Sequence, residues 1–315
     1  MNILVTGGAG FIGSHLVEAL VAKGHRVRVL DDLSTGHARN LRPFGRKVSF
    51  VRGDCADEAT ARKACRGIDA VFHLAAMPSV TRSVKDPLLS HRTNATATLA
   101  MLVAARDAGV QRFVYAGSSA VYGDSPTLPK REDMPTKPLS PYGLGKLTGE
   151  HYVRLFSTLY GMQTLTLRYF NVFGPRQDAG SPYSGVISLF VTALLAGRRP
   201  VIYGDGRQTR DFTYIANVVD ANLRALRAKG LKGQAVNVAT GKRISLLDLH
   251  HALSRELGVD LPPERRPVRA GDIKHSQAAI GAARRLLGYR PLVPFGDGIR
   301  RTVAWYRQAS PPSRG

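Results

Sequence analysis

A tyrosine and a lysine four residues apart are the strongest candidates for acid–base chemistry in this chain. Tyr142 and Lys146 lie in a segment whose Ser140 and Pro141 suit the start of a helix. A spacing of four puts the lysine ammonium beside the phenol on one helical face. Lowering the pKa of a phenol from about 10 to near 7 requires roughly 4 kcal/mol, which a neighbouring cation helps to supply. We expect Tyr142 to act as a base with Lys146 as its partner, although a partly buried tyrosine beside a solvated lysine gives the same pattern.

A second candidate is a serine at the end of an apolar segment. Residues 114–117 are typical of a buried strand, and Ser118 and Ser119 follow directly. The carboxyl ends of parallel strands are where α/β sheets bind their ligands. Ser118 is therefore expected to share a proton with a substrate hydroxyl, the alternative being a serine-rich turn.

A glycine loop near the start of the chain has the spacing of a dinucleotide-binding site. Residues 6–13 satisfy both G-x-G-x-x-G and G-x-x-G-x-x-G between a strand-like run and a helix-like run. Glycines let the backbone approach a pyrophosphate, whose charge then rests on the N-terminus of the helix. The residues predicted to hold the cofactor here are Gly7, Gly10, Phe11, Ile12 and Gly13.

Acidic residues follow the next two strand-like runs. Asp31 and Asp32 lie near the offset of about 20 residues expected for a carboxylate that binds the adenosine ribose. A carboxylate at Asp31 favours NAD over NADP, with Arg39 and Arg42 leaving slight room for NADP. Asp54 is expected to contact the adenine amine, or else to be a loop or capping carboxylate.

The elements that must position these residues alternate in type. Short β-branched runs alternate with longer amphipathic runs through the first half of the chain, which is typical of βαβ units. We predict an α/β fold, a Rossmann-type doubly wound parallel sheet with a smaller mixed α/β lobe. Residues 1–167 are expected to form the NAD-binding domain, rejoined by parts of 210–240, and residues 168–315 most of the substrate lobe.

Composition excludes several classes of protein. The 315 residues carry a formal net charge of +22, but the 34 arginines and 11 lysines never run beyond pairs, so a nucleic-acid partner is not expected. The two cysteines, Cys55 and Cys65, are too few for a disulfide framework, and no Cys/His cluster has metal-ligand spacing. No metal site is predicted. No apolar run approaches the roughly 18 residues of a membrane span and no leader pattern precedes the first strand, so a cytoplasmic protein is expected.

These motifs together resemble the extended short-chain dehydrogenase/reductase family, and within it the NAD-dependent UDP-hexose 4-epimerases. The resemblance rests on the glycine loop, the Ser118 strand, the Tyr142 and Lys146 pair and the run 168–171, and it extends from Asn2 to about Tyr306. It implies an NAD cofactor, a UDP-sugar substrate and a homodimer formed through the helices near 96–108 and 149–160. It also implies that Tyr142, assisted by Ser118, removes the proton of the sugar 4-hydroxyl while the C4 hydride passes to NAD and later returns to the opposite face.

The resemblance assigns further residues by their place in the family motifs. Lys146 and Tyr169 are implied at the nicotinamide end of the cofactor. Bidentate guanidinium groups suit phosphate oxygens, and the resemblance places Arg210 and Arg269 on the diphosphate. The remaining substrate contacts that it implies are Ser79, Asn171, Gln177, Asp272 on the uridine ribose and Ser276.

Ser276 occupies the position that limits sugar size in the family. A small residue there leaves space for an N-acetyl group at C2, so UDP-N-acetylglucosamine is the expected substrate beside UDP-glucose. Two departures from the family pattern are Gly145, expected to loosen its helix, and Ala279, expected to remove a helix cap. Nucleotide-sugar dehydratases and decarboxylases are disfavoured because Ser119 and Ala120 stand where they carry acidic residues. A UDP-uronate 4-epimerase remains open, and a non-catalytic NAD-binding or a nucleic-acid-binding protein are the alternatives from other classes.

Overall fold

The central feature is a seven-stranded parallel sheet. The structure is a computed structural model that describes residues 1–178, 180, 185–268 and 273–309. The strands of the sheet follow the order β3-β2-β1-β4-β5-β6-β11. Their bounds are β1 (Asn2–Thr6), β2 (Arg26–Asp31), β3 (Val48–Arg52), β4 (Ala70–His73), β5 (Arg112–Ser118), β6 (Gln163–Tyr169) and β11 (Gln234–Val238). The chain builds outward from β1 in one direction and from β4 in the other, and sheets of this kind bind their ligands at the carboxyl ends of the strands on either side of this change of direction.

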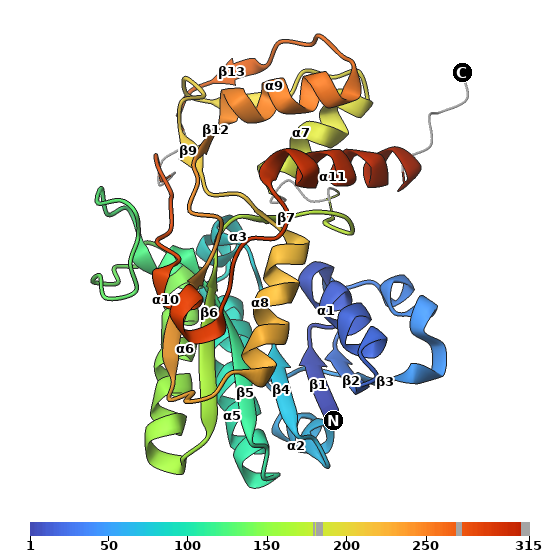
Figure 1. Cartoon of the computed structure of the whole chain (residues 1–315), viewed down its shortest axis with the longest axis vertical. Helices are drawn as coiled ribbons and strands as arrows, with labels where there is room; N and C mark the ends of the chain where they lie inside the picture. Colours follow the sequence, from blue (N-terminus) through green and yellow to red (C-terminus); the bar gives the residue numbers. More distant parts are fainter. Residues whose placement is uncertain (179, 181–184, 269–272, 310–315) are drawn as a thin grey trace.

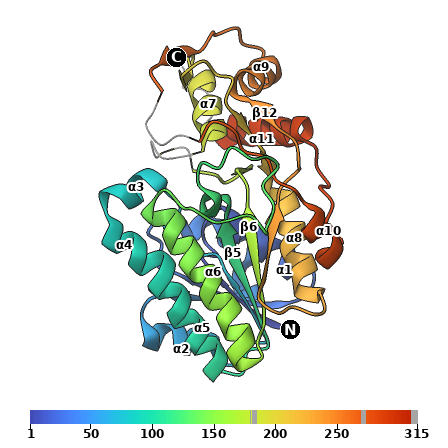
Figure 2. The ribbon, with the colours of Figure 1, turned by 90° about the vertical axis from the view of Figure 1, so that its left-hand side faces the viewer.

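Helices cover both faces of this sheet (Figures 1 and 2). They are α1 (Phe11–Ala22), α2 (Glu58–Cys65), α3 (Val80–Lys85), α4 (Pro87–His91), α5 (Ala97–Asp107), α6 (Pro141–Tyr160) and α8 (Ile215–Arg227). Short 3₁₀ turns span Ala38–Asn40, Arg42–Lys47 and Ser119–Tyr122, and a π-helical turn spans Arg92–Thr96.

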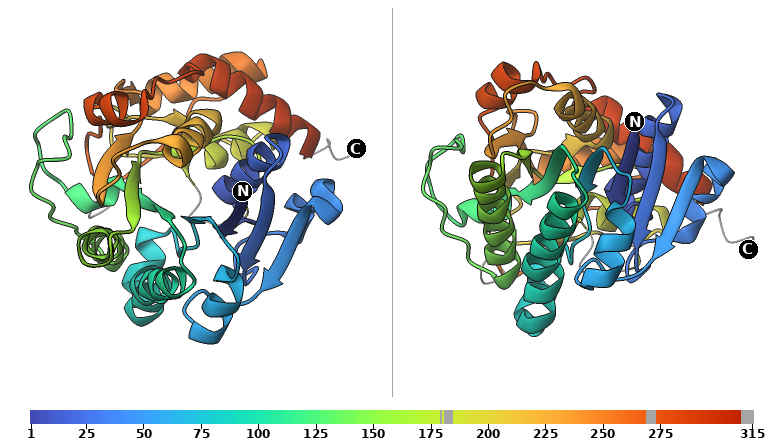
Figure 3. Two further views of the ribbon diagram at one scale, coloured as in Figure 1. Left: turned by 60° about the horizontal axis from the view of Figure 1, so that its bottom comes forward. Right: turned by 90° about the horizontal axis from the view of Figure 1, so that it is seen from below.

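Two hydrophobic clusters hold these layers together. Successive strand residues point to opposite faces, so Ile3 and Val5 pack with α1 and α8 while Leu4 packs with α2, α5 and α6. Figure 3 shows this arrangement from below, with α1 and α8 on one side of the sheet and α5 and α6 on the other. Because both faces are covered, strands such as β4 are buried along their whole length, which explains why they are mostly apolar.

A smaller lobe lies over the carboxyl ends of the strands (Figure 1). Its elements are β7 (Val172–Phe173), α7 (Val186–Leu195), β8 (Val201–Tyr203), β9 (Thr209–Arg210), β10 (Thr213–Tyr214), β12 (Ile244–Ser245), α9 (Leu246–Leu257), β13 (Glu264–Arg266) and α11 (Phe295–Ala309). Its strands form short two-stranded sheets.

The chain returns from the lobe to the central sheet. Helix α8 covers the sheet beside α1, and β11 pairs in parallel with β6, so that Asn237 lies level with Arg168. Helix α10 (Gly281–Leu287), which the sequence did not predict on the sheet, also packs against α8 and β11. The division of roles between an NAD-binding part and a substrate lobe stays a proposal.

Candidate functional site

The glycine loop joins β1 to α1 and has no room for side chains. Gly7 has a φ of +67°, in the left-handed region that favours glycine. A Cβ on Gly13 would lie 2.1 Å from the carbonyl oxygen of Gly7, so only glycine lets the helix start this close to the loop. Gly10 caps α1 with no side-chain hydrogen bond, and the first turn carries no acidic residue. The first backbone N–H groups of α1, including those of Phe11 and Ile12, therefore suit an anion.

Asp31 and Asp32 differ in their surroundings at the end of β2. The buried Asp31 carboxylate accepts the backbone N–H groups of Ala9 and Leu33, each at 2.9 Å. Burial raises the pKa of Asp31, and these two hydrogen bonds oppose the rise. Asp32 is exposed and accepts the backbone N–H and the hydroxyl of Ser34. Asp31 is therefore the acid that lies against the glycine loop, while Asp32 closes a local turn.

Asp54, after β3, is engaged in two contacts. Its carboxylate pairs with Arg92 at 2.7 Å and accepts the backbone N–H of Ala56 at 2.8 Å. The first of these contacts joins residues that are distant in sequence, and the second closes a local turn. Neither tests the expectation that Asp54 binds adenine.

Ser118 is the last residue of β5 and is buried. Its Oγ accepts the backbone N–H of Ala120 at 3.2 Å, which caps the 3₁₀ turn that follows. It lies level with Tyr169 on β6. The Tyr169 side chain points toward α8, where its hydroxyl exchanges hydrogen bonds with Asn222.

Helix α6 brings Tyr142 and Lys146 to the same strand. Ser140 caps the helix by accepting the backbone N–H of Gly143 at 3.1 Å, as its sequence predicts. Tyr142 forms a side-chain hydrogen bond with Ser118. The buried Lys146 donates from Nζ to the carbonyl oxygen of Ala116 at 2.9 Å, two residues before Ser118. The structure thus brings Ser118, Tyr142 and Lys146 together at the carboxyl end of β5.

The electrostatics of this trio are governed by burial. Burial raises the pKa of Tyr142, and the hydrogen bond with Ser118 opposes the rise. Burial lowers the pKa of Lys146 to about 7. The spacing of Tyr142 and Lys146 predicts that the lysine cation, together with the charge of an oxidised nicotinamide ring, lowers the pKa of the tyrosine. Because Lys146 holds its proton weakly, this chain alone leaves Tyr142 as a neutral phenol at neutral pH.

Close packing explains the glycine at position 145, and the sequence did not predict this. A Cβ at this position would lie 2.9 Å from the Cβ of Asn94 in the π-helical turn. Asn94 is buried and its Oδ1 accepts the backbone N–H of Met77 at 3.2 Å. Glycine therefore allows α6 to approach this turn closely. The helix stays continuous from Pro141 to Tyr160.

The residues that the family resemblance assigns to the substrate lie on several elements. Asn171 follows β6 with a φ of +31° and donates to the carbonyl oxygen of Asp211. Arg210, in β9, donates to the carbonyl oxygens of Thr209 and Lys274. Gln177 donates to the carbonyl oxygen of Val172.

Ser276 and Ser79 have different local roles. Ser276 is buried, and its backbone N–H donates to the carbonyl oxygen of Thr209 at 3.0 Å. Ser79 caps α3 by accepting the backbone N–H of Arg82 at 3.1 Å. Arg269 and Asp272 lie outside the described residues.

Asp211 is a site residue that the sequence analysis did not assign. Its fully buried carboxylate accepts the backbone N–H groups of Thr240, Gly241 and Ala278 and the Thr240 hydroxyl, at 2.6 to 3.2 Å. These bonds fix the turn after β11 against the segment that carries Ser276. In the sequence, Asp211 stands next to Arg210 in the run 204–212, which could have marked it as a site residue. Spacing alone does not distinguish a buried carboxylate that holds two segments together from an acid on the surface.

The described residues meet neither the requirements of a metal site nor those of a membrane-spanning helix. Within them, no group of three or more His, Cys, Asp or Glu side chains is arranged to hold a metal. No helix of the described part is both long and apolar enough to span a bilayer.

Comparison with known proteins identifies the family of this chain. The family model described as "NAD dependent epimerase/dehydratase family" matches residues 3–239. The chain belongs to this family. The predictions of the family, of the Rossmann-type fold and of NAD as its cofactor are confirmed.

Individual members of the family are similar over nearly the whole chain. A UDP-glucose 4-epimerase of Mycolicibacterium smegmatis is 43% identical over 98% of this chain and 100% of its own. The solved UDP-N-acetylglucosamine 4-epimerase of Methanobrevibacter ruminantium, in complex with UDP-N-acetylmuramic acid, is 39% identical with a TM-score of 0.94, covering 98% and 99% of the two chains. The UDP-glucose 4-epimerase of Thermus thermophilus, in complex with NAD, is 37% identical with a TM-score of 0.89, covering 98% and 100%.

Proposed function

We propose that this protein is an NAD-dependent 4-epimerase of UDP-hexoses. The observation that carries the proposal is the meeting of Ser118, Tyr142 and Lys146 at the carboxyl end of β5. A base at this edge of the sheet suits proton transfer at a sugar hydroxyl, and the family relatives named above support a UDP-sugar as substrate. Ser119 and Ala120 provide no acid for the elimination that a dehydratase performs.

The residues present fit the dinucleotide. Gly7 and Gly13 keep the loop free of side chains, and the N-terminus of α1 is suited to phosphate. The buried Asp31 lies against this loop, and its proposed role is to bind the adenosine ribose. When bound, NAD supplies the acceptor for the C4 hydride of the sugar. The roles of Asp32, Asp54 and Tyr169 toward the cofactor are part of the same proposal.

The chain's own side chains handle the proton. Tyr142 takes the proton of the 4-hydroxyl, and Ser118, hydrogen-bonded to Tyr142, shares it. Because burial raises the pKa of Tyr142 and lowers that of Lys146, the phenolate form depends on positive charge brought by the bound cofactor. Arg210 anchors the diphosphate, and Asn171 and Gln177 contact the sugar nucleotide.

The width of the sugar pocket is set at Ser276. The residue is buried and small, so we propose that an N-acetyl group at C2 is accepted, as well as a plain hydroxyl. Arg269 and Asp272 on the nucleotide and Ser79 in the sugar pocket complete the proposed substrate contacts.

We also propose that two copies of the chain pair through α6. Leu155, Leu159 and Tyr160 expose between 45% and 60% of their surface, although they lie on a long helix of the sheet layer. An open groove of about 420 Å³ runs beside them, lined by Thr148, His151, Tyr152, Arg154, Leu155 and Thr158. Exposed apolar side chains around a groove favour association of two copies. Light scattering should give twice the chain mass, and Leu159→Arg should reduce it to one chain.

One experiment tests the proposed activity. The protein is incubated separately with UDP-glucose, UDP-N-acetylglucosamine and UDP-glucuronic acid, and the C4 epimers are resolved by chromatography. We expect conversion of the first two without net release of NADH, and no conversion by Tyr142→Phe. Conversion of UDP-glucuronic acid alone would support the uronate epimerase instead. Release of NADH in proportion to product would contradict the proposal.

A further inference from the structure

A short segment that carries Ser276 is held between two neighbours. We call residues 274–279 the strap. Four backbone hydrogen bonds of 2.7 to 3.0 Å hold it, namely Thr209 N–H to Lys274 O, Ser276 N–H to Thr209 O, Lys130 N–H to Gln277 O and Ala279 N–H to Lys130 O. The strap therefore runs between β9 and the loop 124–139, and its position sets the position of Ser276.

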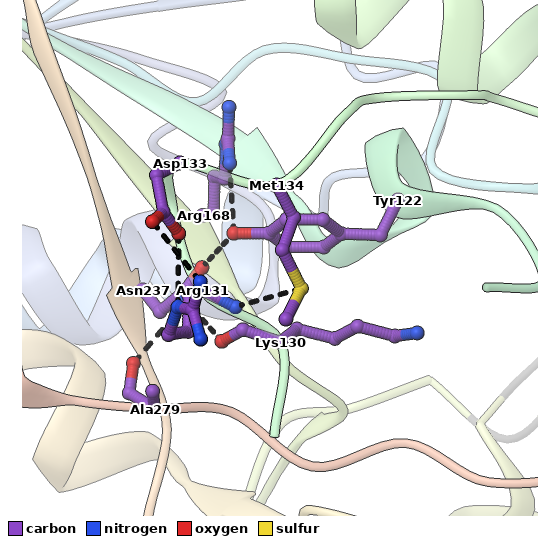
Figure 4. Close-up of polar contacts among 8 residues, drawn as sticks. All are labelled: Tyr122, Lys130, Arg131, Asp133, Met134, Arg168, Asn237 and Ala279. Atoms are coloured by element: carbon purple, nitrogen blue, oxygen red, sulfur yellow. Dashed lines mark hydrogen bonds and ion pairs between the residues drawn. The ribbon is translucent and has the colours of Figure 1, made fainter. Parts of the chain in front are cut away.

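Asn237 holds the strap against β11, an edge strand of the central sheet. This fully buried residue of β11 donates from Nδ2 to the carbonyl oxygens of Lys130 at 2.9 Å and Ala279 at 3.2 Å. Its Oδ1 accepts the Tyr122 hydroxyl at 2.7 Å, and its backbone N–H donates to Glu132 at 2.8 Å. Figure 4 shows the Asn237 side chain between the Tyr122 hydroxyl and these two carbonyl groups. The amide thus uses both its donor and its acceptor ends.

The same chain of hydrogen bonds continues to the helix that carries Tyr142 and Lys146. Tyr122 accepts from the Arg168 guanidinium at 2.7 Å, and Arg168 holds Glu150 of α6 through two contacts of 2.5 and 2.9 Å. Glu150 lies one turn after Lys146 and two turns after Tyr142 on that helix. The strap and the helix of the proposed base are therefore joined by side chains alone, across β6.

The chemistry of the side chains determines which group donates and which accepts in each of these hydrogen bonds. A guanidinium only donates, so the Tyr122 oxygen accepts from Arg168 and its own proton must go to Asn237. That proton holds Oδ1 toward Tyr122, and Nδ2 is then left facing the carbonyl oxygens of Lys130 and Ala279. If the Tyr122 hydroxyl is removed, nothing at that end determines which way the Asn237 amide turns.

We propose that Asn237, oriented by Tyr122 and Arg168, is a positioning residue for sugar selectivity. It fixes the strap, and with it the clearance at Ser276, relative to Tyr142 and Lys146. This inference rests on the proposed function, because it concerns which sugar fits the same site. A shift of the strap by a fraction of an ångström is enough to change how a bulky group at position 276 meets the sugar.

The test uses a background in which position 276 is bulky. Ser276→Tyr is expected to lower kcat/KM for UDP-N-acetylglucosamine at least tenfold relative to UDP-glucose. Adding Tyr122→Phe to this variant is expected to raise the ratio of kcat/KM for UDP-N-acetylglucosamine to that for UDP-glucose at least threefold, because the strap can then move away from the sugar. The ratio is measured in one preparation, so it does not depend on the folded fraction. The matched control is Tyr289→Phe, which removes another buried tyrosine hydroxyl, bonded at 2.9 Å to the carbonyl oxygen of Ala239, and is expected to recover nothing.

A second measurement does not require activity. Hydrogen exchange of a peptide covering residues 273–280 is expected to be at least tenfold faster in Tyr122→Phe than in the wild type, and unchanged in Tyr289→Phe. Unchanged exchange in Tyr122→Phe would overturn the inference, as would faster exchange with an unaltered sugar ratio. If the wild type epimerises neither sugar, the proposed function fails, while the exchange measurement still decides whether Tyr122 and Asn237 hold the strap.

Discussion

The buried pair of Glu150 and Arg168 gives a sharp prediction about stability. Both side chains are almost fully buried, with exposed fractions of 2% and 3%, and they share two contacts of 2.5 and 2.9 Å. Glu150→Gln keeps the shape of the side chain but removes the charge that compensates the guanidinium. Removing one partner of a buried pair costs about 3–5 kcal/mol, because the other charge is left in a medium that solvates it poorly.

The control for this prediction is an exposed pair on a helix. Arg62 and Glu58 contact each other at 3.1 Å with side-chain exposures of 55% and 75%. A pair this exposed contributes at most about 0.5 kcal/mol, so Glu58→Gln should leave stability almost unchanged. The two variants make the same chemical change, and only the burial of the site differs.

The assay is unfolding in urea followed by circular dichroism. The free energy of unfolding is compared among the wild type, Glu150→Gln and Glu58→Gln at constant m value. We expect Glu150→Gln to lower it by about 3 kcal/mol or more, and Arg168→Met added to Glu150→Gln to recover part of the loss. The reasoning is refuted if Glu150→Gln is no more destabilising than Glu58→Gln.

Three further predictions concern the cofactor, the sugar and pH. Gly13→Ala, whose Cβ would lie 2.1 Å from the Gly7 oxygen, should weaken NAD binding at least tenfold in a calorimetric titration while a UDP titration changes little. Ser276→Tyr should lower kcat/KM for UDP-N-acetylglucosamine at least tenfold and spare UDP-glucose, and equal activity on both sugars would contradict a size limit at this position. Because burial lowers the pKa of Lys146 from 10.5 to about 7, the unfolded chain binds more protons between these values, so this residue makes the free energy of unfolding rise with pH there. From pH 7 to 9 the rise attributable to Lys146 is about 2 kcal/mol, and urea unfolding of Lys146→Met should lack it.

Local spacing is what made the core of the site predictable. The glycine loop needs a strand before it and a helix after it, and the Tyr142 and Lys146 pair needs only four residues of helix, so both can be identified from neighbouring residues. The fold class follows in the same way from the alternation of strand-like and helix-like runs. The family, the fold and the cofactor were confirmed by the comparisons.

Contacts between distant residues could not be predicted from spacing. Asp54 meets Arg92 across 38 residues, and Asn237 meets Lys130 across 107. Asp211 is an anchor because the turn after β11 and the segment that carries Ser276 both donate to its carboxylate, and no local sequence pattern predicts that these two segments meet. From helix propensity alone, Gly145 was expected to loosen its helix. The structure shows that glycine is needed there because the Asn94 side chain of another element lies against this position.

The return of the chain from the lobe to the sheet has a consequence for how the protein can be divided. Strand β11 forms an edge of the central sheet, and α8 covers one face of it, yet both come after the first lobe elements in the sequence. A fragment ending at residue 167 would expose the edge of β6 and the apolar surface beneath α8, and we expect it to aggregate. Because the chain crosses between the sheet and the lobe more than once, we expect the two parts not to behave as separate modules that can be exchanged between relatives. We therefore expect widening of the site for a larger sugar to come from local changes, such as those at the strap.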